Sequence, residues 1–357
     1  MSRLRPVGRS GPDPMNSVAR AVQNFARLAL NFAQHQLSAQ PMQKTFCVAG
    51  QNIGITESER VALDWLDGQF TPQTGPVKNR IYADYSNWAS NFAPASAVLV
   101  GMSELHVDEY LAAVNLRGSF YGPLNRWEFF DPESRIGIRL QTHPSAYPEW
   151  EPTAPFANFL NWIMMADGKT VLHAATLGLK GKGVLIAGPG GSGKSGTTLA
   201  GILHGLSTVG DDYVVVDTAE KMTAYPFFHK IKQDVSGLSR VGLTLNSDVT
   251  VPLNWQNKYV FDVRKIAPDA AVDRLNVIAV LLPEITNRSN TTFSPASAFE
   301  ILQALAPSTM KQLGGDRRAT FRTCAEISRN ISGYHLHLGT NPAEISARIS
   351  EFIGKAK

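Results

Sequence analysis

The chain has 357 residues, of which 43% are hydrophobic and 18% are charged, and its formal net charge is +4. This balance is typical of a globular protein and excludes a disordered, collagen-like or coiled-coil chain, while so small a charge gives no argument for nucleic-acid binding. The two cysteines, Cys47 and Cys324, form no CxxC pair, which excludes a zinc ribbon or a disulfide scaffold and indicates a reducing compartment.

Residues 1–42 are expected to form a flexible basic tail and an amphipathic helix. The opening MSRLRPVGRSGPDP is rich in turn-forming residues and has no apolar periodicity. Over Asn16–Leu37, apolar residues recur at spacings of three and four, as on one face of a helix. Docking of this helix on the protein's own body is favoured over a partner or an anionic lipid surface. The sequence has neither an apolar stretch long enough to span a membrane nor a signal peptide, so we expect a cytoplasmic protein.

Residues 43–150 are expected to form a smaller α+β region without a functional motif. Thr45–Ile55 alternates loosely and predicts a strand, and Glu57–Leu66 predicts a short helix. Further on, Ala97–Val100 and Ile136–Leu140 predict two more short strands.

Residues 151–357 are expected to form an α/β catalytic domain. Phe156–Met165 predicts a helix and Val171–Leu179 an alternating strand. The continuous apolar run Gly183–Ala187 is typical of a buried strand, and Thr197–His204 predicts the helix that follows it.

The segment between these last two elements, GPGGSGKS, matches the phosphate-binding pattern GxxxxGK[ST] in full. Its glycines allow successive backbone N–H groups to turn toward a polyphosphate at the start of a helix. The lysine would neutralise the β- and γ-phosphates, and the serine hydroxyl would be a ligand of Mg²⁺. The predicted nucleotide-binding residues are Gly188, Pro189, Gly190, Gly191, Ser192, Gly193, Lys194, Ser195 and Gly196.

Three sets of carboxylates could meet the γ-phosphate. Asp217 ends the apolar run that begins at Tyr213, and Glu284 follows the apolar run Val277–Leu282. The third set is the adjacent pair Asp211 and Asp212, of which one acid would hold Mg²⁺ and the other would accept a proton from an attacking hydroxyl.

These segments resemble the HPr kinase/phosphorylase superfamily of serine kinases, whose P-loop domain is related to phosphoenolpyruvate carboxykinase. The resemblance rests on His173, Gly181-Lys-Gly183, the strand and phosphate loop, and Gly210-Asp-Asp-Tyr213. The end of the chain, Ile331–Gly339 followed by the helical Pro342–Ile353, is also similar. Gly196 replaces the glutamate usual in true HPr kinases, so the chain looks more like the divergent group that includes kinases of lasso-peptide precursors.

The resemblance implies a P-loop kinase core that transfers the γ-phosphoryl group of ATP, with Mg²⁺, to a hydroxyl, most plausibly a serine of a protein or peptide. Asp211 would accept the hydroxyl proton, Asp212 and Ser195 would hold the metal ion, Lys194 would stabilise charge, and His173 would lie near the metal or phosphate. A homo-oligomer is consistent with the family.

Other functions stay open at this point. The acceptor could be a small-molecule hydroxyl, or the chain could be a nucleotide-dependent ATPase switch or binding module that uses Asp217 or Glu284. A scaffold whose N-terminal helix recruits a partner is a further alternative.

A cation opposite Lys194 is also expected. Its candidates are His229-Lys-Ile-Lys232, Arg264, Arg288 and Arg317-Arg318, which the sequence does not rank. His335 and His337 share one strand face without acidic neighbours in the sequence, which argues against a metal site there.

Overall fold

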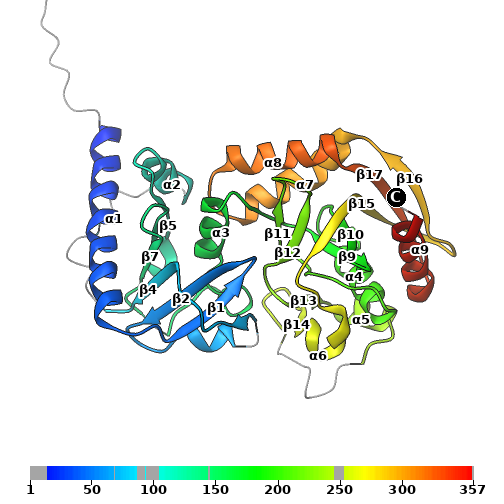
Figure 1. The fold of residues 1–357 in the computed structure, drawn as a ribbon, viewed down its shortest axis with the longest axis horizontal. Coiled ribbons are helices and arrows are strands. Elements are labelled where there is room, and N and C mark those ends of the chain that lie inside the picture. The colour runs from blue at the N-terminus through cyan, green and yellow to red at the C-terminus, as the bar shows by residue number, and fades with distance from the viewer. Residues whose placement is uncertain are drawn as a thin grey trace, which may run out of the picture.

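The fold is described from a computed structural model, which covers residues 14–67, 69–86, 93, 104–143, 145–244 and 253–355, with backbone only at 14–16 and 104–106. Two sheets lie side by side along the long axis, with a short helix between them (Figure 1). The mixed α/β class predicted from the sequence is confirmed. The predicted strand Ala97–Val100 lies outside the described residues. Within the described ranges, no helix is both long and apolar enough to cross a membrane.

The N-terminal sheet has seven strands in the order β3-β1-β2-β4-β7-β6-β5. Neighbours β2, β4 and β7 run parallel, and the remaining neighbours are antiparallel. The strands are β1 (Lys44–Val48), β2 (Gln51–Glu57), β3 (Thr71–Pro72), β4 (Asn79–Asp84), β5 (Arg117–Tyr121), β6 (Arg126–Asp131) and β7 (Ile136–Leu140). The predicted strand Ile136–Leu140 is therefore confirmed.

Two predictions in this region were wrong. The single strand Thr45–Ile55 is a hairpin, because Ala49 and Gly50 adopt positive φ angles of 46° and 82° and reverse the chain. The helix predicted over Glu57–Leu66 is only a 3₁₀ turn, Leu63–Leu66, because Glu57 still belongs to β2. The Glu57 carboxylate accepts hydrogen bonds from the N–H groups of residues 61–63 and so holds the intervening segment in a turn.

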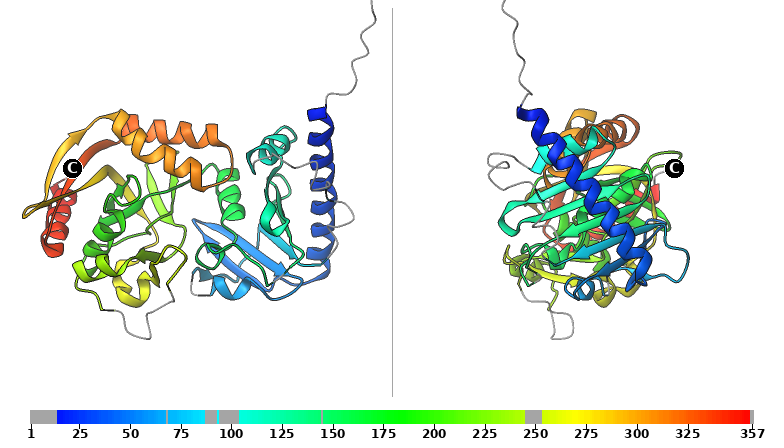
Figure 2. Two further views of the ribbon diagram at one scale, coloured as in Figure 1. Left: turned by 180° about the vertical axis from the view of Figure 1, so that it is seen from behind. Right: turned by 90° about the vertical axis from the view of Figure 1, so that its left-hand side faces the viewer.

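The N-terminal helix α1 (Pro14–Ala39) crosses one face of this sheet (Figure 2). Phe25 is 1% exposed and meets Trp127 and Phe129 edge-on, with ring centroids 5.3 and 5.4 Å apart. Helix α2 (Glu104–Ala112) covers the same side, where Val107 and Leu111 join this core. The prediction that the first helix docks on the protein's own body is confirmed.

The C-terminal sheet has eight strands, of which six follow the order β16-β17-β15-β12-β11-β8, while β10 pairs with β15 and β9. The strands are β8 (Thr170–Leu172), β9 (Ala175–Leu179), β10 (Lys182–Ile186), β11 (Val214–Asp217), β12 (Thr223–Pro226), β15 (Leu275–Arg288), β16 (Thr292–Ala296) and β17 (Ser332–Gly339). A separate ribbon consists of β13 (Lys230–Gln233) and β14 (Tyr259–Asp262). The strand predicted over Val171–Leu179 is divided at His173, since β8 pairs with β11 and β9 with β10.

Helices cover both faces of the C-terminal sheet. Helices α4 (Lys194–Leu203) and α9 (Pro342–Lys355) enclose one apolar core, and α7 (Ala298–Gln312) and α8 (Arg317–Asn330) enclose another. The short helices α5 (Val235–Arg240) and α6 (Val263–Ile266) flank the β13–β14 ribbon. The predicted helices over residues 156–165, 197–204 and 342–353 are confirmed, with bounds shifted by a few residues.

The two halves of the chain share a core. Helix α3 (Ala157–Ala166) lies between the two sheets (Figure 1) and buries Phe159 and Trp162. The same cluster contains Phe70 from the N-terminal half and Phe228 from the C-terminal half, whose ring centroids are 5.7 Å apart. This shared packing brings the N-terminal sheet close to the loop that follows β10.

Candidate functional site

The glycine-rich loop lies between β10 and α4, at the carboxyl end of two parallel strands. Ile186, the last residue of β10, pairs with Leu281 of β15. Gly191 and Gly193 have φ angles of +82° and +109°, which side chains rarely adopt. A Cβ on Gly193 would also lie 2.8 Å from the Leu338 side chain, so the tight turn requires glycine there.

Helix α4 begins directly after this turn without a side-chain cap at Gly193. Its first N–H groups and its positive dipole end therefore face the loop, an arrangement that suits a phosphate group. Lys194 is 7% exposed, and its Nζ donates to the carbonyl oxygens of Gly188 (2.7 Å) and Pro189 (3.1 Å). Burial lowers the pKa of Lys194, and the nearby Asp211 and Asp212 charges oppose that effect.

Asp211 and Asp212 follow Gly210 at the entry to β11, beside the loop. Asp211 is 2% exposed, and neither of its carboxylate oxygens has a hydrogen-bond partner among the described residues. Burial and the neighbouring Asp212 charge raise the pKa of Asp211 to about 7, and the nearby Ser195 and Lys194 only partly offset this. Asp212 adopts a left-handed φ of 67°.

Asp212 lies in an opposite electrostatic environment. Lys232 Nζ is 3.0 Å from Asp212 Oδ2, and His173 Nε2 is 3.8 Å from Asp212 Oδ1. Burial alone would raise the pKa of Asp212, but Lys232 and His173 hold it well below its usual range. The two adjacent acids therefore differ: Asp212 is favoured in its charged form, whereas the pKa of Asp211 lies near neutral pH.

A cavity of about 760 Å³ connects these parts. Its lining includes the loop from Gly190, together with Lys194, Ser195, Asp212 and His173. Lys232 lines the same cavity, and of the cations considered from the sequence it alone does so. Asp211 does not line the cavity in this structure. A space of this size is within the range of pockets that bind small molecules.

The other predicted candidates lie elsewhere. Asp217 accepts a hydrogen bond from the Ala219 N–H, and neither it nor Glu284 lines the cavity. The expectation that His335 and His337 lack acidic neighbours was wrong, because the fold brings Glu284 within 2.7 Å of His335 and 3.0 Å of His337. Within the described ranges, no group of three or more histidine, cysteine, aspartate or glutamate side chains is arranged to hold a metal ion.

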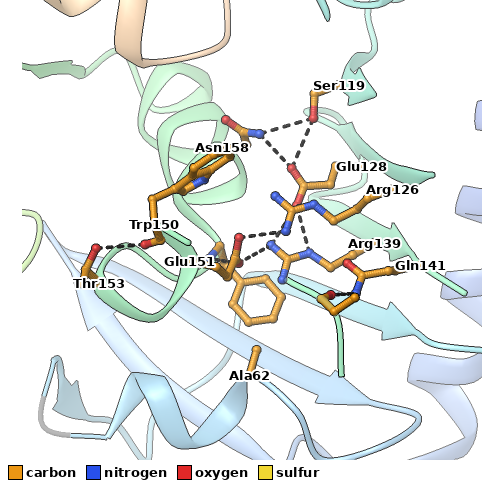
Figure 3. Close-up of polar contacts among 12 residues, drawn as sticks. Ala62, Ser119, Arg126, Glu128, Arg139, Gln141, Trp150, Glu151, Thr153 and Asn158 are labelled. Carbon is orange, nitrogen blue, oxygen red and sulfur yellow. Dashed lines mark hydrogen bonds and ion pairs between the residues drawn. The ribbon is translucent and has the colours of Figure 1, made fainter. Parts of the chain in front are cut away.

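The cavity wall supplied by the N-terminal half was not predicted from the sequence. Arg126 and Glu128 on β6, Arg139 on β7 and Glu151 form a buried network of ion pairs that lines the cavity (Figure 3). Asn158 at the start of α3 joins it by donating to Glu128 (2.8 Å). On the opposite half of the chain, Trp255, Arg240 and Lys258 also line the cavity.

Comparison with known proteins finds no matching family model and no matching curated protein. Among solved structures, the chain is similar to the Hpr(Ser) kinase/phosphatase from Coxiella burnetii, with 16% identity over 51% of this chain and 97% of that chain. The TM-score is 0.28, so this likeness does not by itself indicate a function.

Proposed function

We propose that the protein is an ATP- and Mg²⁺-dependent kinase that transfers the γ-phosphoryl group to a hydroxyl, most plausibly that of a serine in a protein or peptide. One observation carries the proposal: the phosphate loop with Lys194, the Ser195 hydroxyl and the Asp212 carboxylate all line one cavity. Phosphoryl transfer needs these groups together, because its catalysis depends on positioning and on stabilising negative charge.

The donor set fits a magnesium ion. Ser195 and Asp212 supply a hydroxyl and a charged carboxylate to the same cavity, and Mg²⁺ prefers such oxygen ligands beside phosphates. When bound, the ion would neutralise charge on the β- and γ-phosphates.

Transfer then requires a group that accepts the proton of the attacking hydroxyl. Asp211 is suited to this role because it lies beside Ser195, which lines the cavity, and because its pKa of about 7 lets it take up a proton near neutral pH. The hydroxyl oxygen would form a bond to the γ-phosphorus while the bond to the bridging oxygen of ADP breaks. The proton passes to Asp211, and Lys194 stabilises the charge on the phosphoryl oxygens.

The test is phosphoryl transfer from γ-labelled ATP and Mg²⁺ in a lysate of the cells that make the protein. The parent is expected to label an acceptor, and K194A should bind ATP weakly and label nothing. K182A is a matched control, since Lys182 lies on β10 and does not line the cavity.

Two results would contradict the proposal. The first is labelling by K194A at the parental rate. The second is steady release of phosphate by the parent without an acceptor, in which case an ATPase switch would be the better description.

A further inference from the structure

We propose that the N-terminal wall of the cavity binds the acceptor, and that the acceptor is a serine-bearing peptide segment whose backbone carbonyl takes a hydrogen bond from Arg126. This inference rests on the proposed kinase function and names the substrate class of the same cavity. The N-terminal wall consists of six residues that all line the cavity (Figure 3): Arg126, Glu128, Arg139, Trp150, Glu151 and Asn158.

A chain of contacts leads from the residue after Asp212 to this wall. Tyr213, the residue after Asp212, donates its hydroxyl to Gln312 Oε1 at 2.8 Å. Gln312 and Leu313 line the cavity, and the carbonyl oxygen of the next residue, Gly314, accepts a hydrogen bond from the Asn161 side chain of α3. A molecule that rests on the N-terminal wall therefore shares the cavity with Asp212 and Tyr213.

The wall is rigid because its charged groups hold one another. Arg126 Nη1 donates to Glu151 Oε2 at 2.8 Å, and Arg139 Nη2 lies 2.7 Å from a carboxylate oxygen of both Glu128 and Glu151. The Arg139 guanidinium also stacks over the Phe156 ring, 4.1 Å from its centroid. Side chains fixed in this way lose little freedom when a ligand binds.

The second arm of the Arg126 guanidinium makes no hydrogen bond within this network. The side chain of Arg126 is only 6% exposed, and no hydrogen bond joins its Nη2 to any described residue. Both oxygens of Glu128 already accept hydrogen bonds, from Arg139 on one side and from Asn158 and Ser119 on the other. Because Arg126 lines the cavity, this arm of its guanidinium is available to donate to an oxygen atom of a ligand.

The charge balance of this network determines which kind of ligand oxygen can bind to Arg126. The network contains two guanidinium groups and two carboxylates. Burial would raise the pKa of Glu151, but the Arg139 and Arg126 charges outweigh burial and hold this pKa at about 2. Because the charges already balance, a further anion would bring an uncompensated charge into a buried site. A peptide carbonyl satisfies Arg126 Nη2 without adding charge, whereas a phosphate or a carboxylate would not.

The edge of the wall favours the same class of ligand. Trp150 is 40% exposed, lines the cavity and is braced edge-on by Tyr121, with centroids 5.3 Å apart. An exposed indole beside a polar donor can pack against a peptide backbone or an apolar side chain while the donor binds a carbonyl.

The experiment uses a degenerate peptide library with one fixed serine, and the same library with alanine as a blank. Labelling from γ-labelled ATP is measured for the parent and for R126K and W150A. R126K keeps a charge beside Glu151 but loses the second guanidinium arm. We expect R126K to lose about tenfold in kcat/KM for peptide, as for one hydrogen bond to a charged group, and W150A to lose about tenfold through lost aromatic packing. The KM for ATP should stay unchanged in both. Y147A is the matched control, because Tyr147 is 45% exposed and does not line the cavity.

The outcomes separate this inference from the proposed function. If the parent fails to bind ATP at all, the kinase proposal itself fails. If the parent binds ATP but labels free serine, glycerol or inositol instead of the serine library, the acceptor class is wrong. If peptides are labelled equally well by the parent, R126K and W150A, the acceptor lies elsewhere in the cavity. Cooperative thermal melting of each variant shows that it is folded.

Discussion

At the scale of single residues, the acid pair is the feature that the sequence and the structure describe differently. Spacing alone makes Asp211 and Asp212 equivalent, whereas the fold gives one a raised and the other a lowered pKa. Neighbouring acids with opposed pKa shifts are typical of sites where one group transfers a proton and the other stays charged. The pair therefore yields a prediction about both members.

We expect D211N to reduce kcat by about 10²- to 10⁴-fold, the usual contribution of a general base, while ATP affinity and the Mg²⁺ concentration for half-maximal rate stay unchanged. D212N should instead raise that Mg²⁺ concentration, because the ion loses a charged ligand. Initial rates over a Mg²⁺ titration measure both effects. Of the two acids, Asp212 lines the cavity and Asp211 does not. If D212N lowers kcat and D211N raises the Mg²⁺ requirement, the two roles must be exchanged.

The buried network supports a second prediction at this scale, concerning acid stability. Burial alone would raise the pKa of Glu151, but Arg139 and Arg126 outweigh it and lower that pKa from 4.5 to about 2. A depressed pKa means that the folded state binds the charged form better. The contribution of Glu151 is therefore fully present above about pH 4.5 and is lost as the pH falls toward 2.

E151Q should accordingly lower the free energy of unfolding at pH 7 by about 3–5 kcal/mol, as expected when one partner of a buried ion pair is removed. The difference in unfolding free energy between the parent and E151Q should become smaller as the pH falls below 4.5. Urea unfolding at several pH values measures this. E133Q is the control, since Glu133 is exposed. A difference that does not change with pH would mean that the Glu151 charge does not stabilise the fold.

At the scale of elements, the turn from β10 into α4 depends on backbone conformation as much as on Lys194. In G193A, the new Cβ lies on a residue with a φ of +109° and against the Leu338 side chain. In G190A, the new Cβ has no atom within 4 Å. We expect G193A to lose about 1–2 kcal/mol of unfolding free energy, the cost of a left-handed non-glycine residue, and to lose ATP affinity. G190A should change stability by less than about 1 kcal/mol. Thermal unfolding and ATP titration compare them, and equal stability of the two would contradict the argument.

The same scale explains what could be predicted from the sequence. The phosphate loop and the acid pair are local patterns whose spacing is set within a few residues, so they were recognisable without coordinates. The N-terminal wall was not, because strand register alone places Glu128 opposite Arg139. A signal existed: Arg126 and Glu128 alternate among the aromatics of β6, where inward charges need partners. Nothing in the sequence identifies those partners or shows that Asp211 and Asp212 have different pKa values.

At the scale of the whole molecule, the two sheets are joined by a shared apolar core rather than by a linker. Phe228 is 3% exposed, and its ring contacts Phe227 and Phe70, with centroids 4.6 and 5.7 Å away. Because Phe70 belongs to the N-terminal half, the stability of the nucleotide site should depend on that half. Unfolding is then expected to be a single cooperative transition.

F228A tests this coupling. We expect a loss of about 3–5 kcal/mol, as for a buried phenylalanine, with the protein still unfolding in one step. Five of the six tryptophans lie between residues 65 and 162, so fluorescence follows the N-terminal half, while ATP binding follows the phosphate loop. Both signals should change at the same urea concentration in the parent and in F228A. F321A, which removes a side chain 45% exposed on α8, should change stability by less than about 0.5 kcal/mol. Separate transitions for the two signals would mean that the two halves fold independently. The shared core would then not fix the N-terminal wall beside the phosphate loop.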